Sequence, residues 1–142
     1  MNCVTDIEVE KIVAPEAKEL RLPGGLLGFE QMKDYLLISN PDEEPFLWLQ
    51  AKDDATLAFV VMNPFLVAPD YQPDVPQSDV ESVGLKEVGD ALLLNIVTVH
   101  GQANATINLK GPIVINRHTR VAKQVVIANA VDYSVKHPLP LN

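Results

Sequence analysis

Three basic side chains lie close together in the stretch INRHTRVAKQVV, residues 115–126. Arg117, Arg120 and Lys123 fall within seven positions, so they raise the possibility of a contact with a phosphate backbone. A nucleic-acid surface normally interleaves basic residues with aromatic rings that stack on bases, and this stretch has no Phe, Tyr or Trp. The residues therefore favour a structural β-hairpin, or a contact with an acidic protein surface, over an RNA site.

The other polar residues do not form a pattern typical of catalysis or metal binding. His100, His118 and His137 make no HxH or HExxH pair, which is the spacing expected of a zinc site. The acidic triplet at 42–44 follows a proline and lacks the spaced ligands and glycine of a calcium loop. The glycine-rich PGGLLGFE at 23–30 has no Lys-Ser or Lys-Thr, so it predicts turns rather than a phosphate loop. We expect no enzyme activity, metal or cofactor.

Charge is unevenly distributed along the chain. Residues 1–90 hold 18 acidic and 6 basic side chains, a net charge of −12, whereas residues 91–142 hold one acidic and five basic, a net charge of +4. An acidic surface repels nucleic acid and attracts basic proteins. The balance predicts a basic protein partner and argues against direct RNA binding.

The elements that position these residues are predicted to be strands. Apolar runs rich in Val, Ile and Leu recur between Pro, Gly, Asn and Asp, which is the pattern of strands bounded by turns. The predicted strands are 6–13, 18–22, 35–38, 46–51, 57–62, 91–99, 105–109, 112–116 and 121–127. We interpret residues 1–142 as a single-domain, mostly β protein with an antiparallel β-barrel-like fold and one or two short helices.

Two windows carry helix signals. In SDVESVGL, Ser78 followed by Glu81 is the pattern of a capping box, and Gly84 is placed to end a short helix. The weaker window is FEQMKDY, residues 29–35, directly after Gly28.

The sequence predicts no membrane span and no secretory leader. Its longest run free of Asp, Glu, Lys, Arg and His, residues 55–69, holds fifteen residues and is interrupted by Asn63-Pro64, so it is too short to cross a bilayer. The acidic N-terminus lacks a basic region and an apolar core. The single cysteine, Cys3, has no partner for an internal disulfide. These features predict a cytoplasmic protein.

The aromatic residues divide into two groups. Trp48 and Phe59 fall in apolar runs, so both are predicted to be core residues. Tyr71 lies in PDYQPDVP, which has no strand pattern, and an aromatic ring on a loop is a candidate interface anchor.

The segment 63–74, NPFLVAPDYQPD, combines two aromatic and two acidic side chains with prolines that limit its freedom. The predicted partner-binding residues here are Phe65, Asp70, Tyr71 and Asp74. The alternative is that Phe65 and Leu66 plug the end of the barrel and Tyr71 covers them, because apolar residues beside a strand usually belong to the core.

Eight short stretches, read in order, carry a resemblance to a known family. They are GLLGFE (25–30), FLWLQ (46–50), LAFVVMNPF (57–65), PDY (69–71), LNIVT (94–98), NLKGPIVIN (108–116), KQVV (123–126) and HPL (137–139). The chain resembles the flagellar assembly factor FliW family nearly from end to end. Ala122 stands where family members often carry glycine, which leaves the geometry of that turn open.

The resemblance implies a non-enzymatic cytoplasmic protein of β-barrel-like fold that binds two partners in turn, flagellin and the basic translational regulator CsrA. When flagellin is exported, the freed protein would capture CsrA and relieve the repression of flagellin translation. Charge alone suggests Asp42, Glu43 and Glu44 as further partner-binding residues. The alternatives are a small OB-like RNA-binding barrel and, more remotely, a hydrolase.

Overall fold

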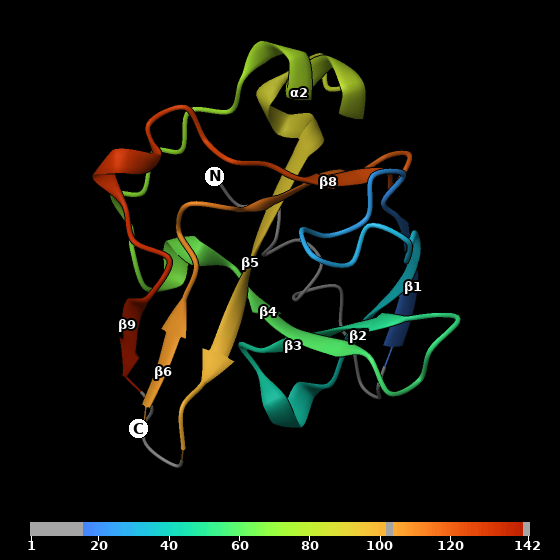
Figure 1. Cartoon of the computed structure of the whole chain (residues 1–142), viewed down its shortest axis with the longest axis vertical. Coiled ribbons are helices and arrows are strands. Elements are labelled where there is room, and N and C mark those ends of the chain that lie inside the picture. Colours follow the sequence, from blue (N-terminus) through green and yellow to red (C-terminus); the bar gives the residue numbers. More distant parts are fainter. Residues whose placement is uncertain (1–15, 102–103, 141–142) are drawn as a thin grey trace.

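The computed structural model describes residues 16–101 and 104–140, which form an antiparallel nine-stranded sheet with short helical segments between the strands (Figure 1). The strands are β1 (Glu16–Arg21), β2 (Asp34–Ser39), β3 (Leu47–Ala51), β4 (Ala58–Met62), β5 (Ala91–Val99), β6 (Asn104–Ile107), β7 (Ile113–Asn116), β8 (Ala122–Gln124) and β9 (His137–Pro140). The helical segments are η1 (Pro41–Glu43), η2 (Pro64–Leu66), α2 (Gln77–Val83), η3 (Val88–Asp90) and η4 (Ala130–Asp132).

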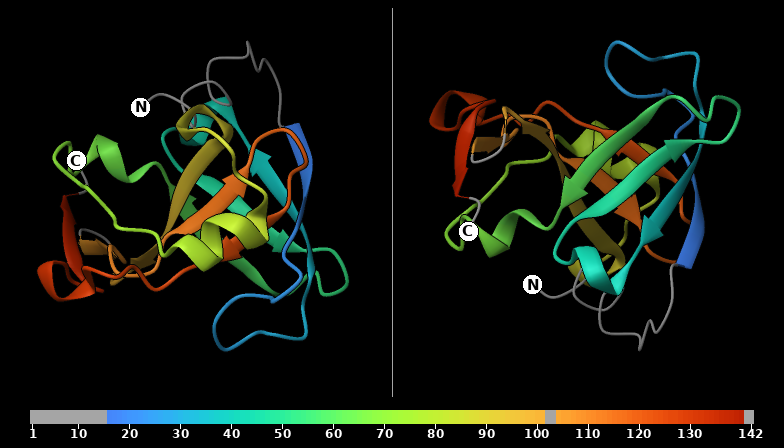
Figure 2. Two further views of the ribbon diagram at one scale, coloured as in Figure 1. Left: turned by 90° about the horizontal axis from the view of Figure 1, so that it is seen from above. Right: turned by 90° about the horizontal axis from the view of Figure 1, so that it is seen from below.

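The sheet curves until its first and last parts meet. Neighbouring strands follow the order β1-β2-β3-β4-β5-β6-β9, while β7 pairs with both β5 and β8. Arg21, the last residue of β1, forms an isolated bridge with Val121, which directly precedes β8. The Arg21 amide also donates to the Arg120 carbonyl at 3.0 Å. Figure 2 shows the strands wrapped around a common interior. The predicted antiparallel, barrel-like fold is confirmed, although the regular ladders do not run through a full circle.

Strand β5 joins the two halves of the sheet because it is longer than its neighbours. Its first half, residues 91–94, pairs with β7, and its second half, residues 97–99, pairs with β6. A nine-residue strand reaches roughly 30 Å, which is long enough to serve both ladders.

Three buried clusters result from this arrangement, and the smallest consists of Leu93, Val114 and Val125. We call the first the barrel core; it lies inside the curved strands and includes Tyr35, Leu37, Leu49 and Ile115. The second core lies on the other side of the sheet, between β5, β6, β9 and the loops that cover them, and its buried members are Met62, Tyr71, Val97, Ala105, Ile107, Leu109, Ile127 and Leu139. Alternation along β2 and β3 sends every other side chain into the barrel core, as the two-residue period of a strand requires.

Most predicted strands are present with small shifts at their ends. The range 121–127 is too long, because β8 ends at Gln124, and the predicted strand 6–13 lies outside the described residues. Strand β9 was not predicted, because it contains Pro138 and Pro140. Its pairing with β6 places it at an end of the strand order, where missing amide donors do no damage to the sheet.

The helix α2 is found where the sequence predicts it, but its cap differs. The N-cap is Pro76 with no side-chain hydrogen bond, so the capping box predicted for Ser78 and Glu81 is wrong. Gly84 ends the helix with φ of 79°, the left-handed geometry that glycine adopts without strain. A capping box does occur at η3, between Glu87 and Asp90.

The helix predicted for residues 29–35 does not form. Phe29 donates its amide to Leu26 at 2.8 Å and pairs with it in an isolated bridge, across a turn in which Gly28 has φ of 88°. The Glu30 carboxylate accepts from the Gly28 amide at 3.0 Å. The turn and the start of β2 at Asp34 leave no room for a helix.

The basic stretch at 115–126 is a β-hairpin. Among the described residues, Arg120 is the one non-glycine with positive φ, at 64°, and Asn116 braces the turn by accepting from the amides of His118 and Thr119. Ala122 is the first residue of β8 and is 1% exposed. The residue that adopts the left-handed conformation of the turn is therefore Arg120 and not Ala122. Lys123 forms an ion pair with Asp79 of α2, and this contact supports the structural interpretation of the hairpin.

Candidate functional site

The acidic triplet Asp42, Glu43 and Glu44 is held in a tight turn between β2 and β3. The Asn40 side chain accepts from the Asp42 amide at 3.0 Å, and the Glu43 carbonyl accepts from the Phe46 amide at 2.9 Å. The three carboxylates are exposed. The local sequence therefore presents three negative charges on a backbone fixed by its own hydrogen bonds.

Trp48 lies next to this turn on the outer face of the sheet. Its neighbours in β3, Leu47 and Leu49, are 2% and 1% exposed, whereas Trp48 is 38% exposed. Its partners across the strands are Ile38 and Val60, so its side chain shares their side of the sheet. The prediction that Trp48 is a core residue is wrong, because an apolar run does not reveal which of its members faces outward.

Phe59 belongs to the core, as predicted, but its side chain is only partly buried. It pairs with Leu49 and packs partly buried against the barrel core. Its ring contacts Phe29 edge-on at a centroid distance of 5.2 Å.

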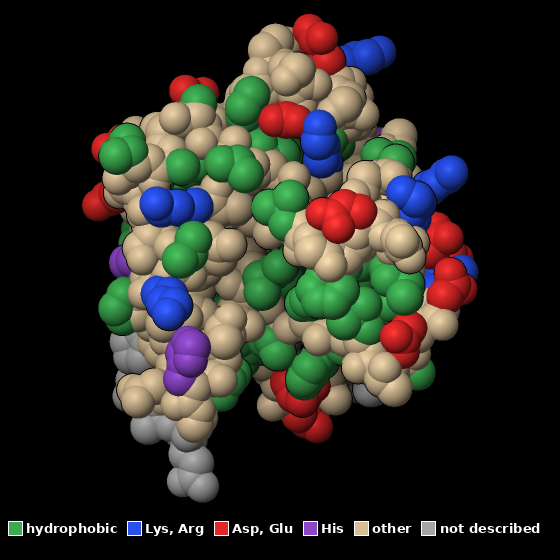
Figure 3. Space-filling view, in the orientation of Figure 1, with side chains coloured by type: hydrophobic (Ala, Val, Ile, Leu, Met, Phe, Trp, Pro, Cys, Tyr) green, Lys and Arg blue, Asp and Glu red, His purple; other side chains and the backbone are tan. Residues whose placement is uncertain are grey.

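Trp48 and the acidic turn together form a hollow. It has a volume of about 450 Å³, and its lining is Asp42, Glu43, Glu44, Phe46, Trp48, Val60 and Val99. We call it the Trp48 hollow. The indole Nε1 of Trp48 donates to the Glu43 carboxylate at 3.2 Å. Figure 3 shows hydrophobic side chains gathered over β3 and β4, with acidic side chains below them at η1. The hollow thus pairs an apolar floor with a negatively charged rim.

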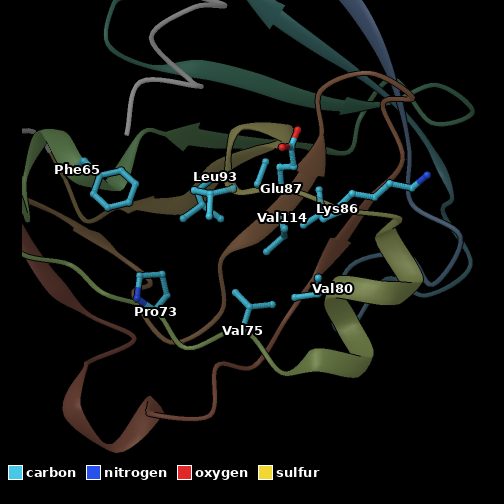
Figure 4. A pocket seen from close by; sticks show the side chains of 11 residues that line it. Phe65, Pro73, Val75, Val80, Lys86, Glu87, Leu93 and Val114 are labelled. Carbon is cyan, nitrogen blue, oxygen red and sulfur yellow. The ribbon is translucent and has the colours of Figure 1, made fainter.

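A second hollow, the Phe65 cleft, lies between η2, α2 and the strands β5 and β7. Its volume is about 400 Å³, and its lining is Phe65, Pro73, Val75, Val80, Leu85, Lys86, Glu87, Val88, Ala91, Leu93 and Val114. In Figure 4 the apolar side chains surround the space, while the Lys86 amine extends away from it. Apart from Lys86 and Glu87, the cleft is apolar.

The segment 63–74 is folded back onto the second core. Tyr71 is 3% exposed. Its hydroxyl donates to the Leu109 carbonyl at 2.6 Å, and its ring meets Tyr133 edge-on at a centroid distance of 4.9 Å. Burial raises the pKa of Tyr71 to about 12. The interpretation of Tyr71 as an exposed loop aromatic is wrong; its part in partner binding stays a prediction, and its side chain is not on the surface to make direct contact.

The other predicted residues of this segment do reach the surface. Phe65 is half-buried and lines the Phe65 cleft. Asp70 is exposed at a third hollow, together with Tyr133 and His137. Asp74 is exposed while its backbone is tied down, since its amide donates to the Asn129 side chain at 2.8 Å. The seven predicted residues therefore divide among separate surfaces, and their roles stay predictions.

Two of the histidines have local side-chain partners. His118 Nε2 lies 2.9 Å from the Asp90 carboxylate, and His100 Nε2 lies 3.0 Å from the Thr106 hydroxyl. The backbone amides of Glu87 and Lys86, with His118, hold the pKa of Asp90 below its usual value. Across residues 16–101 and 104–140, no three His, Cys, Asp or Glu side chains are grouped so as to hold a metal ion. No helix in this part of the chain is long and apolar enough to cross a membrane.

Sequence reasoning placed the acidic triplet but missed the aromatic residue beside it. The signal was present in FLWLQ, where alternation puts Leu47 and Leu49 on one face and Trp48 on the other. Val99 was also missed; it lies at the end of β5 and is 55% exposed.

Comparisons with known proteins agree with the resemblance seen in the sequence. The chain matches the family model described as FliW protein over residues 4–139. It is 38% identical over 138 residues to the flagellar assembly factor FliW of Natranaerobius thermophilus, covering 96% of this chain and 91% of the relative. It is 40% identical over 121 residues to the FliW of Leptospira interrogans, covering 84% and 81%.

A solved structure leads to the same family. The crystal structure of the flagellar assembly factor FliW superposes with a TM-score of 0.76 at 34% sequence identity, covering 84% of each chain. Family model, relatives and fold agree over most of the length, so the chain belongs to the FliW family of flagellar assembly factors.

Proposed function

We propose that this chain is a non-enzymatic cytoplasmic regulator that binds flagellin and the translational regulator CsrA in turn. While flagellin is abundant in the cell, it stays bound to this chain, and CsrA is left free. Once flagellin is exported, the freed protein captures CsrA, and flagellin translation resumes.

The observation that carries this proposal is the Trp48 hollow. Three carboxylates at its rim give the negative potential that attracts a basic RNA-binding protein and repels the RNA that competes for it. Its exposed indole and apolar floor give the partly hydrophobic centre that protein interfaces use as an anchor. Family membership supports the flagellar role.

Flagellin is proposed to use a different surface, the segment 63–74 and the Phe65 cleft. The support is the apolar lining of the cleft and the exposed carboxylate of Asp74, which lies in the chain between the lining residues Pro73 and Val75. An apolar cleft with an acidic edge suits a partner segment with an apolar face.

The direct test is isothermal titration calorimetry of the protein with purified CsrA and, separately, with flagellin from the same cell. Binding of CsrA should weaken as salt rises, because exposed charges are screened beyond about 8 Å at physiological ionic strength. The triple variant Asp42→Asn, Glu43→Gln, Glu44→Gln should weaken CsrA binding by about tenfold or more.

A matched control removes three exposed carboxylates elsewhere, through Asp53→Asn, Glu81→Gln and Asp132→Asn. It changes the net charge equally and leaves the hollow intact, so it should retain most of the affinity. Equal losses in both variants would show that only net charge matters. Absence of any complex with CsrA at low salt would refute the proposed function.

A further inference from the structure

The indole of Trp48 is presented on a rigid platform. It stands on β3, which is paired on both sides by β2 and β4, and its Nε1 is tied to Glu43. Trp48 is nevertheless 38% exposed. A large aromatic ring tied in place by a hydrogen bond and partly exposed is pre-organised for binding, because little side-chain freedom is lost on contact.

The side chains around the Trp48 ring indicate which kind of ligand would fit the hollow. Phe46, Val60 and Val99 give an apolar floor, and the lining of the hollow, all within the described residues, contains three carboxylates and no Lys or Arg. A negatively charged rim around an aromatic face is suited to a cation with an apolar stem. The face of Trp attracts a cation within about 6 Å of the ring centroid, and the carboxylates accept its hydrogen bonds.

We propose that the Trp48 hollow binds one arginine side chain of a basic protein partner. The guanidinium stacks on the indole and donates to the carboxylates at the rim, and its methylene stem lies on the apolar floor. Arginine suits this site better than lysine, since its planar guanidinium both stacks on a ring and forms paired hydrogen bonds with a carboxylate. This inference rests on the proposed function, in which CsrA is the partner that supplies the arginine.

Trp48 is the one tryptophan in the chain, so its indole N–H gives a single NMR signal that reports on the hollow. The first arm of the test titrates the protein with an acetylated Gly-Arg-Gly amide, and with the same tripeptide carrying citrulline, which has the shape of arginine without its charge. The arginine peptide should shift the indole signal progressively, and the citrulline peptide should shift it at least about fivefold less.

The second arm measures CsrA affinity of two variants. Trp48→Leu keeps an apolar side chain and removes the aromatic face, and should weaken binding by about tenfold or more. Trp48→Phe keeps an aromatic face and loses the hydrogen bond to Glu43, and should weaken binding by about threefold. Unchanged circular dichroism spectra would confirm that both variants are folded.

The two proposals fail in different ways. If CsrA binds the Trp48→Leu variant as tightly as the unmodified protein and the arginine peptide leaves the indole signal unmoved, the arginine site is refuted while CsrA binding stands. If CsrA does not bind at all, the proposed function fails, and the peptide titration alone decides whether the hollow takes an arginine. Equal shifts with arginine and citrulline would also overturn the inference.

Discussion

Trp48 and Tyr71 are two aromatic residues whose surroundings are the reverse of what their local sequence predicts. Trp48 sits in the apolar run FLWLQ and is 38% exposed, whereas Tyr71 sits in the proline-rich stretch PDYQPDVP and is 3% exposed. The first belongs to a regular strand and the second to a segment without strand or helix. Membership in a strand therefore says little about burial unless the face is known, and a loop buries its side chains when it is packed against a sheet.

The difference in exposure between Trp48 and Tyr71 arises from the groups that pack against each side chain. Trp48 lies on the convex side of the curved sheet, where the described chain provides only part of a cover. The Tyr71 ring contacts the rings of Phe65 and Tyr133, and its hydroxyl donates a hydrogen bond to the Leu109 carbonyl. One region is left partly open to solvent, and the other is closed by the protein itself.

Replacing Tyr71 by alanine should give the largest effect of this comparison. The substitution removes a buried ring and the hydrogen bond to Leu109, so the free energy of unfolding should fall by about 3–5 kcal/mol. Denaturant titration followed by circular dichroism measures this loss. As a control, Val131→Ala in the adjacent η4, where Val131 is 86% exposed, should change stability by less than about 0.5 kcal/mol. A near-zero effect of Tyr71→Ala would indicate that the Tyr71 side chain is exposed in solution.

Tyr71 should also make stability depend on alkaline pH. Its pKa is about 12 in the folded protein because burial favours the neutral hydroxyl, against about 10 in an unfolded chain. Between these values the unfolded chain loses the proton while the folded protein keeps it. The free energy of unfolding therefore falls as pH rises above 10, by about 2 kcal/mol at pH 12.

The variant Tyr71→Phe isolates this contribution. Burial also raises the pKa of Tyr35, but Tyr35 is present in both proteins, so its effect cancels in the difference. Urea titrations at several pH values between 9 and 12, compared for the two proteins, measure the Tyr71 term. Parallel pH profiles would show that the Tyr71 hydroxyl ionises as freely in the folded protein as in the unfolded chain.

Replacing Trp48 by alanine should have a smaller effect on stability than replacing Tyr71. We expect a loss of about 1–2 kcal/mol, because part of the ring is already in contact with water and contributes little on burial. The same denaturant titration measures it. Fluorescence gives an independent check, since the emission of this single tryptophan should be readily quenched by acrylamide. A loss equal to that of Tyr71→Ala would mean that Trp48 is a core residue after all.

Much of the fold was predictable because it depends on local pattern. Alternation and turn residues located most strands, and Gly84 marked the end of α2. The failures occurred where local signals compete. The residues FEQMKDY have helical composition but follow a turn fixed by the Leu26–Phe29 bridge, and β9 forms despite Pro138 because a partner strand lies beside it.

The candidate site was predictable in its charges and not in its geometry. The order of the amino acids is enough to establish that the first 90 residues are strongly acidic, that three carboxylates follow Pro41, and that the chain resembles the FliW family. The position of Trp48 beside those carboxylates and the burial of Tyr71 become visible in the folded protein. The reason is that charge and strand pattern are carried by neighbours in sequence, whereas exposure depends on which distant segments, such as Tyr133 for Tyr71 and Val99 for Trp48, pack against each face.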